Sequence, residues 1–192
     1  PLATRTVRPV THSALSVALR PTARAVRAQA VQLQPHRLPQ AAGLERGYPR
    51  YRLLVSRSPA GLVDFLAAGP PPVYVGFGSL PQRSPSQTTG LVLEALERSG
   101  QRGVIAAGWG GLSDGGLSRP GVFSLESIAH DWLFPRVVAV VHHGGSGTTG
   151  AGLRAGVPSV LVVHAGDQPL WARRLVELGV SPGFIPRQQL TA

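Results

Sequence analysis

Short apolar runs bounded by glycine, proline or polar residues recur along the last two thirds of the chain. Runs of this length and composition are typical of strands buried on both faces of a parallel sheet. The clearest run is Val137 to Val141, which has no polar residue on either face. The pattern predicts strands at residues 73–77, 103–107, 122–125, 137–141 and 159–163.

Helical patterns occupy the spaces between the predicted strands. A helix is expected over residues 86–98, with Ser86 as its cap and Gly100 as its stop. Further helices are expected over residues 148–155 and from residue 169 onward, where Trp171 and later apolar residues recur at helical spacing. Strands that alternate with helices indicate right-handed crossovers and a single sheet. The predicted fold class is therefore α/β, a Rossmann-like, doubly wound parallel sheet.

The first 60 residues lack this pattern. Prolines interrupt any helix, and few apolar side chains are present to form a core. We therefore expect residues 1–60 to be a disordered or weakly structured Arg/Pro-rich segment, and residues 61–192 to be a domain truncated where a final helix is expected. Two other interpretations of this segment stay open: an organellar transit peptide, because it is rich in arginine and poor in acids, or a stretch translated out of frame.

Of the formal charge of +10, that segment carries +9. Residues 1–60 hold ten arginines and one acid, whereas residues 61–192 hold nine arginines and eight acids. No aromatic platform or RNA-binding motif accompanies the arginines, so no specific nucleic acid partner is expected. The apolar runs are far shorter than the roughly 20 residues needed to cross a bilayer. We expect a cytoplasmic protein with at most peripheral membrane contact. The absence of cysteine excludes a disulfide framework and a thiolate site.

The predicted strand 137–141 leads directly into a glycine-rich turn, residues 142–148, and then into a helix. A turn in this position presents unpaired backbone N–H groups at the positive end of a helix dipole, which is an anion site that needs no lysine. Its glycines allow close approach to phosphate, and His143 and Thr148 add donors. The spacing is neither the dinucleotide-binding nor the Walker pattern. A tight turn without a ligand would contain the same glycines, so the turn alone leaves both interpretations open.

Ligands of open α/β sheets lie beyond the carboxyl ends of the strands. Ser79, the loop 108–111, the turn 142–148 and the loop 164–168 are therefore expected on one rim. Asp167, in the last of these loops, either contacts the ligand or caps the following helix. Trp109 and Trp132 are expected to be packing residues.

Five motifs occur in order along the chain: Gly-Phe-Gly-Ser at 76–79, His-Asp-Trp-Leu-Phe-Pro at 130–135, His-His-Gly-Gly-Ser-Gly-Thr-Thr at 142–149, Gly-Val-Pro at 156–158 and Gly-Asp-Gln at 166–168. This order resembles the UDP-glycosyltransferase superfamily of GT-B fold, in particular its bacterial antibiotic and fungal sterol glucosyltransferase branch. The resemblance covers residues 62–192 and corresponds to most of the C-terminal, donor-binding domain.

The resemblance implies a role for each matching residue. The donor diphosphate would contact Ser79, His143, Gly145, Ser146, Gly147 and Thr148. The donor sugar would contact Asp167 and Gln168, and Ser127 and Ile128 would border the uracil. The chain departs from the family at Ala129, where proline is usual, and at Val163-His164, where Pro-Phe or a similar pair is usual. Ala151 replaces the ribose-binding glutamate of the plant branch, so the ribose contact is unassigned.

The function implied by this resemblance is transfer of a hexose, in the first instance glucose, from a UDP-sugar to a hydroxyl of a hydrophobic lipid, sterol or natural-product acceptor, with inversion. The catalytic base belongs to an N-terminal acceptor domain that is missing here, so no catalytic residue is expected in this chain, and the chain alone is expected to be inactive. No metal or cofactor is implied beyond the UDP-sugar co-substrate. The alternatives are a non-catalytic nucleotide-sugar-binding module or a degenerate gene fragment.

Overall fold

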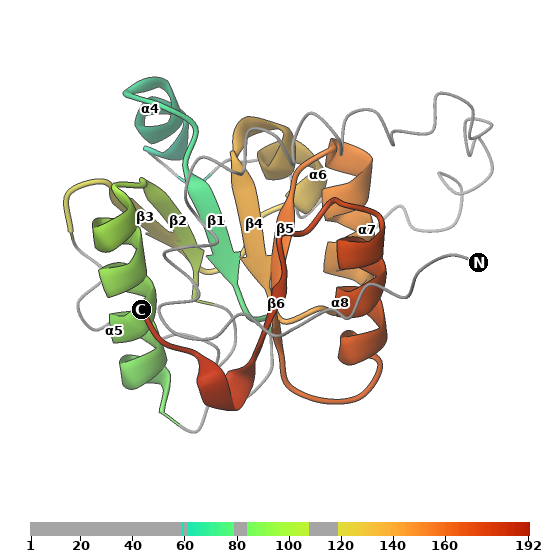
Figure 1. Ribbon diagram of the computed structural model, residues 1–192. Coiled ribbons are helices and arrows are strands. Elements are labelled where there is room, and N and C mark those ends of the chain that lie inside the picture. Colours follow the sequence, from blue (N-terminus) through green and yellow to red (C-terminus); the bar gives the residue numbers. More distant parts are fainter. Residues whose placement is uncertain (1–58, 60, 79–83, 108–118) are drawn as a thin grey trace.

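The computed structural model describes residues 59, 61–78, 84–107 and 119–192. Ser79, the loop 108–111 with Trp109, and the first 58 residues lie outside these ranges. Within them, six strands form one parallel sheet in the order β3-β2-β1-β4-β5-β6 (Figure 1). The strands are β1 (Val73–Gly76), β2 (Gly103–Ala106), β3 (Val122–Leu125), β4 (Ala139–His142), β5 (Ser159–Val163) and β6 (Phe184–Pro186). This confirms the predicted doubly wound sheet.

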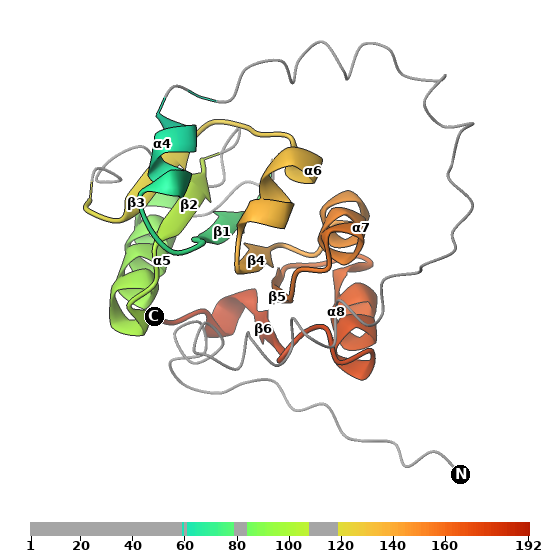
Figure 2. The same ribbon diagram turned by 90° about the horizontal axis from the view of Figure 1, so that it is seen from above.

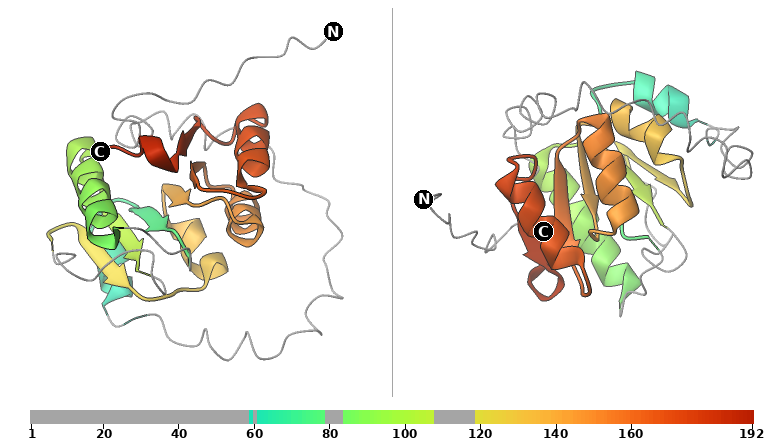
Figure 3. Two further views of the ribbon diagram at one scale, coloured as in Figure 1. Left: turned by 90° about the horizontal axis from the view of Figure 1, so that it is seen from below. Right: turned by 90° about the vertical axis from the view of Figure 1, so that its right-hand side faces the viewer.

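Helices cover both faces of the sheet. They are α4 (Leu62–Ala67), α5 (Pro85–Ser99), α6 (His130–Leu133), α7 (Ser146–Ala155) and α8 (Gln168–Glu177), with 3-10 turns η2 (Phe134–Arg136) and η3 (Arg187–Gln189). Figures 2 and 3 show α5 on one side of the sheet and α7 and α8 on the other. No helix in the described ranges combines the length and apolar character that a bilayer crossing requires.

Alternation along the strands divides the core into two layers. Val73, Val75 and Val141 point toward α5 and share a buried cluster with it. Tyr74 and Val140 point the other way, into a cluster that includes Leu62 of α4, Leu133 of α6 and Ala151 of α7. Because helices cover both faces, the strands are apolar at nearly every position, as the sequence pattern predicts.

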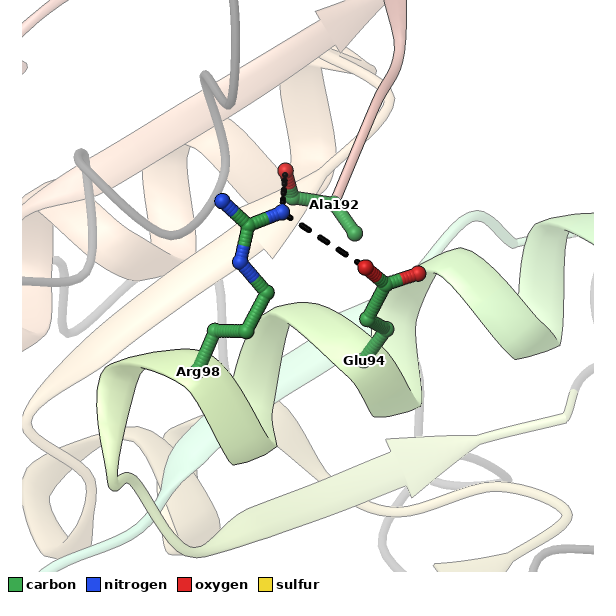
Figure 4. Close-up of polar contacts among 3 residues, drawn as sticks. All are labelled: Glu94, Arg98 and Ala192. Atoms are coloured by element: carbon green, nitrogen blue, oxygen red, sulfur yellow. Dashed lines mark hydrogen bonds and ion pairs between the residues drawn. The ribbon is translucent and has the colours of Figure 1, made fainter.

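The last residues return to the α5 side of the molecule. Ala192 is only 5% exposed, and its carbonyl accepts a 2.8 Å hydrogen bond from the Arg98 guanidinium of α5. Glu94, one turn earlier on α5, lies 3.5 Å from the same guanidinium (Figure 4). The segment after β6 is thereby tied to the opposite half of the sheet.

Several boundaries differ from the sequence prediction. Ser86 lies inside α5 and is not its cap, because Pro85 occupies the first helical turn and favours a start one residue earlier. The prediction that β4 begins at Val137 is wrong, since η2 precedes the strand and delays its start to Ala139. Helix α6 and strand β6 have no counterpart in the prediction, because each is too short to show a period.

Candidate functional site

The sheet order reverses between β1 and β4, which makes this pair the topological switch point where open α/β sheets bind ligands. Gly76, the last residue of β1, is in register with His142, the last residue of β4. The segments that follow, Phe77-Gly78 and His143-Gly144, therefore leave the sheet side by side at its carboxyl edge. This edge is at the bottom of the sheet in Figure 1.

His143 lies against Gly78, which follows β1, and against Gly145, which belongs to its own turn. A Cβ on Gly78 would come within 2.9 Å of His143 Cε1, and a Cβ on Gly145 within 2.5 Å of His143 Nε2. Gly78 also has a φ of +63°, which other residues adopt at a cost. The imidazole thus occupies space that a side chain at position 78 or 145 would fill, so glycine is required at both positions for the ring to lie there. Its Nδ1 is buried and has no hydrogen-bond partner among the described residues. Burial lowers the pKa of His143, so the ring is neutral and keeps one donor and one acceptor.

His142 supports the turn from inside the protein. It is fully buried, and its Nδ1 accepts a 3.1 Å hydrogen bond from the backbone N–H of Gly144. Burial, reinforced by His143 and His130, lowers the pKa of His142 to about 3, so Nδ1 stays free to accept. Gly144 adopts a φ of +92°, and a Cβ there would meet Leu161 and Gln168 at 3.0 and 3.2 Å. His142 has no role among the residues predicted from the sequence to contact the donor. A polar residue ending an otherwise apolar strand was the available signal.

The amino terminus of α7 faces the same rim. The first bond of its helical ladder runs from Thr149 N to Gly145 O, at 2.9 Å. The N–H groups of Ser146, Gly147 and Thr148 precede this bond, as in the first turn of any helix. Ser146 and Gly147 are exposed, and a Cβ on Gly147 would meet nothing within 4 Å. The predicted anion-binding backbone is therefore accessible from the rim.

Gln168 fastens the loop between β5 and α8. Its Oε1 accepts hydrogen bonds from His164 N at 2.7 Å and Ala165 N at 3.2 Å, and the residue is only 8% exposed. Its contact with the Gly144 position brings this loop against the glycine-rich turn. The structure therefore places the turn 142–148 and the loop 164–168 together, as expected for a shared rim.

Asp167 is exposed at the beginning of α8. The expectation that its side chain could cap this helix is wrong: no side-chain cap bond is formed. Its Oδ2 accepts a 2.8 Å hydrogen bond from Trp171 Nε1 instead. The physical reason is that Asp167 already has helical backbone angles, φ −82° and ψ −7°, whereas a capping residue adopts extended ones.

The predicted uracil-side residues follow β3, near one edge of the sheet. Ser127 is exposed, and Ile128 packs against the core cluster of the α7 side. Three strand spacings separate β3 from β4, or about 14 Å. These residues thus lie on the same rim but are not brought into contact with the glycine-rich turn. Ala129 has a φ of −66°, which also suits the proline usual in the family.

Other residues near the switch point were missed by sequence reasoning. The Tyr74 hydroxyl lies 3.2 Å from His130 Nε2, and the His130 ring stacks on Phe134. Helix α6 brings His130 to Tyr74 of β1.

Burial lowers the pKa of His164, which follows β5, to about 4, with smaller contributions from Arg187 and His143. The pairing of β4, β5 and β6 brings His143, His164 and Arg187 near one another. Trp132 packs as expected, against the core and under the guanidinium of Arg136.

The sequence of this domain is similar to those of known glycosyltransferases. The family of erythromycin biosynthesis protein CIII-like C-terminal domains matches residues 117–192. A sterol 3-beta-glucosyltransferase of Arabidopsis thaliana is 53% identical over 130 residues, which are 67% of this chain and 20% of that protein. The described domain is a GT-B glycosyltransferase C-terminal domain. A vancomycin aglycone glucosyltransferase of Amycolatopsis orientalis is 44% identical to it over 121 residues, 62% of this chain and 28% of that protein.

Solved structures show the same fold. The crystal structure of a UDP-glucose: anthocyanidin 3-O-glucosyltransferase in complex with UDP superimposes with a TM-score of 0.58 at 23% identity. The match covers 73% of this chain and 33% of that one. The chain thus matches about a fifth to about a third of the length of each of these three relatives. This GT-B domain therefore corresponds to only a part of each of those proteins.

Proposed function

We propose that this GT-B domain binds a UDP-sugar, with UDP-glucose as the first candidate, and forms the donor half of an inverting glycosyltransferase. The acceptor would be a hydroxyl of a hydrophobic lipid, sterol or natural product. The proposal rests mainly on the position of His143, which lies against Gly78 and Gly145 beside the open amino terminus of α7. A ring N–H and unpaired backbone N–H groups at one point are complementary to a diphosphate.

The strand order supports one orientation of the donor along the rim. Ser127 and Ile128 follow β3, the glycine-rich turn follows β4, and Asp167 follows β5. A UDP-sugar with its uracil near β3 and its diphosphate at α7 would have its sugar near Asp167 and Gln168. The sequence identity of 53% to a sterol glucosyltransferase and of 44% to a vancomycin aglycone glucosyltransferase supports a glucosyl donor and a hydrophobic acceptor.

The chemistry proposed for this domain is electrostatic. An acceptor oxygen attacks the anomeric carbon from the face opposite UDP, and the bond to the diphosphate oxygen breaks as the new bond forms. Negative charge then grows on the leaving diphosphate, where the α7 N–H groups and His143 would stabilise it. The proton of the acceptor hydroxyl would go to a base in an acceptor domain. Within the described ranges, no three His, Asp or Glu side chains are grouped as metal ligands, and the proposal requires no metal.

The proposal is tested by calorimetry on the full chain in the absence of divalent metal, with UDP, UDP-glucose, AMP and NAD as ligands. We expect UDP and UDP-glucose to bind more tightly than AMP and NAD. Equal or tighter binding of NAD would contradict a UDP site. The chain alone should not transfer glucose to a sterol or macrolide. Turnover with such an acceptor would show that the base lies within the chain.

A further inference from the structure

The Asp167–Trp171 hydrogen bond closes a side-chain contact across the first turn of α8. We propose that Trp171 is a positioning residue, which holds the carboxylate of Asp167 in the orientation that receives the hydroxyls of the donor sugar. The inference rests on the proposed function, in which Asp167 contacts the sugar. It gives a role in the site to a residue that the sequence pattern places only on the apolar face of a helix.

Trp171 is itself fixed by the core. Its ring packs against the buried cluster between β5 and α8, which contains Leu161, Val163, Ala172 and Leu175. The indole N–H is therefore held relative to β5, the strand from which the Asp167 loop departs. A rigid donor of this kind restricts the rotation of the side chain that it binds.

Asp167 has little else to orient its side chain. It is exposed, makes no side-chain cap bond and belongs to no ion pair within the described residues. Its backbone carbonyl accepts from Leu170 N and Trp171 N at 3.0 and 3.3 Å, which fixes the main chain but leaves the carboxylate free to turn. The indole bond occupies Oδ2. Oδ1 then remains for a ligand, and a carboxylate oxygen accepts well from sugar hydroxyls.

Gln168 completes the support from the other side. By accepting from His164 N and Ala165 N, it fixes the loop that precedes Asp167. Gln168 also lies against Gly144 of the glycine-rich turn. The Asp167 main chain is thus set relative to the proposed diphosphate site, and Trp171 sets the direction of its carboxylate. A site whose groups are held in place before binding loses less freedom when the ligand arrives.

The competing interpretation is that the Asp167–Trp171 bond is only a contact on the helix surface. Such an i, i+4 contact would contribute to the stability of α8 and would have no preference among ligands. The two interpretations are separated by comparing UDP, which has no sugar, with UDP-glucose.

The test uses the full chain with Trp171→Phe, which keeps an aromatic ring in the core and removes the indole N–H. UDP affinity should stay within about twofold of wild type, whereas UDP-glucose should weaken by about threefold to tenfold, the range for one lost hydrogen bond. Unchanged affinity for both ligands, with only a lower Tm, would overturn the proposal. An equal loss for both ligands would overturn it as well, because Trp171 would then support the domain as a whole.

A double-mutant cycle with Asp167→Ala supplies the control. If Trp171 acts through Asp167, then Trp171→Phe should have no further effect on UDP-glucose affinity once the carboxylate is gone. A further loss in that background would show that Trp171 acts on the sugar by another route, and would reject the positioning role. A wild-type chain that fails to bind UDP would reject the proposed function and this inference together. A wild type that binds UDP-glucose, with an unaffected Trp171→Phe variant, would reject the inference alone.

Discussion

His142 Nδ1 accepts the backbone N–H of Gly144 at 3.1 Å, and this bond closes the turn on which the candidate site is built. The bond holds Gly144 at a φ of +92° while the following N–H groups stay available at the amino terminus of α7. A buried side chain therefore sets the shape of the turn, and the exposed side of the turn is left for a ligand.

Gly145→Ala should displace His143 without unfolding the domain. The added Cβ would lie 2.5 Å from His143 Nε2, the outer edge of a ring that can rotate away, and Gly145 has an ordinary φ of −61°. UDP affinity measured by calorimetry should fall on the order of tenfold, through loss of the histidine contact. Gly90→Ala is the matched control, because its Cβ would meet nothing within 4 Å and Gly90 lies inside α5. It should raise stability by about 0.5 to 1 kcal/mol and leave UDP binding unchanged.

Gly147→Ala should separate the stability of the domain from its binding of UDP. A Cβ on Gly147 meets nothing within 4 Å, so the unliganded domain should be as stable as wild type or more stable by up to about 1 kcal/mol. If a phosphate approaches the first turn of α7, the same methyl group stands in its way, and UDP should bind more weakly. A stabilised variant with wild-type UDP affinity would remove Gly147 from the predicted diphosphate contacts.

His143→Ala and Asp167→Asn should affect different parts of one ligand. Removing the His143 ring should weaken UDP and UDP-glucose together, by about 1.5 to 3 kcal/mol for a contact to a charged group. Asp167→Asn keeps an oxygen that can accept from Trp171 and removes the negative charge, so it should weaken UDP-glucose and spare UDP. Paired titrations of the two variants with both ligands are the measurement. Unchanged UDP-glucose affinity in Asp167→Asn would remove Asp167 from the sugar site.

The stability of the domain should depend on pH through His142. Its pKa is lowered to about 3 in the folded state, against 6.5 ordinarily. Well above pH 6.5 neither state binds the proton, so His142 adds no pH dependence there. As pH falls from 6.5 toward 4, the unfolded state binds more protons, and the free energy of unfolding decreases by up to about 1.4 kcal/mol per pH unit.

His142→Asn tests this assignment, since asparagine keeps an acceptor for the Gly144 N–H and does not titrate. Urea unfolding between pH 4 and pH 7 should give a shallower slope for the variant than for wild type, whatever its absolute stability. Equal slopes would mean that other groups, including His130, His143 and His164, account for the pH dependence.

Much of the fold could be predicted because its determinants are local. Gly100 ends α5 with a φ of 65°, as its position after an amphipathic helical pattern indicates. Strands β3 and β5 occur at the predicted residues, because glycine, proline and polar residues bound both apolar runs. The glycine-rich turn lies between a strand and a helix, as both flanking patterns predict, but its predicted bounds are too wide. Strand β4 includes His142 and α7 begins at Ser146, two residues before the predicted start, so only residues 143–145 lie between them.

The amino-acid sequence by itself thus determined the parallel α/β class, the presence of a glycine-rich turn between a strand and a helix within residues 142–148, and the family that its motifs resemble. Only the tertiary structure decided that His143 meets Gly78, that His142 supports Gly144 and that Asp167 binds Trp171 rather than capping α8. Periodicity reports which face of an element is buried, but it carries no information on which side chains from other strands meet there. Those contacts depend on the strand order and register, which are set by packing across the whole sheet.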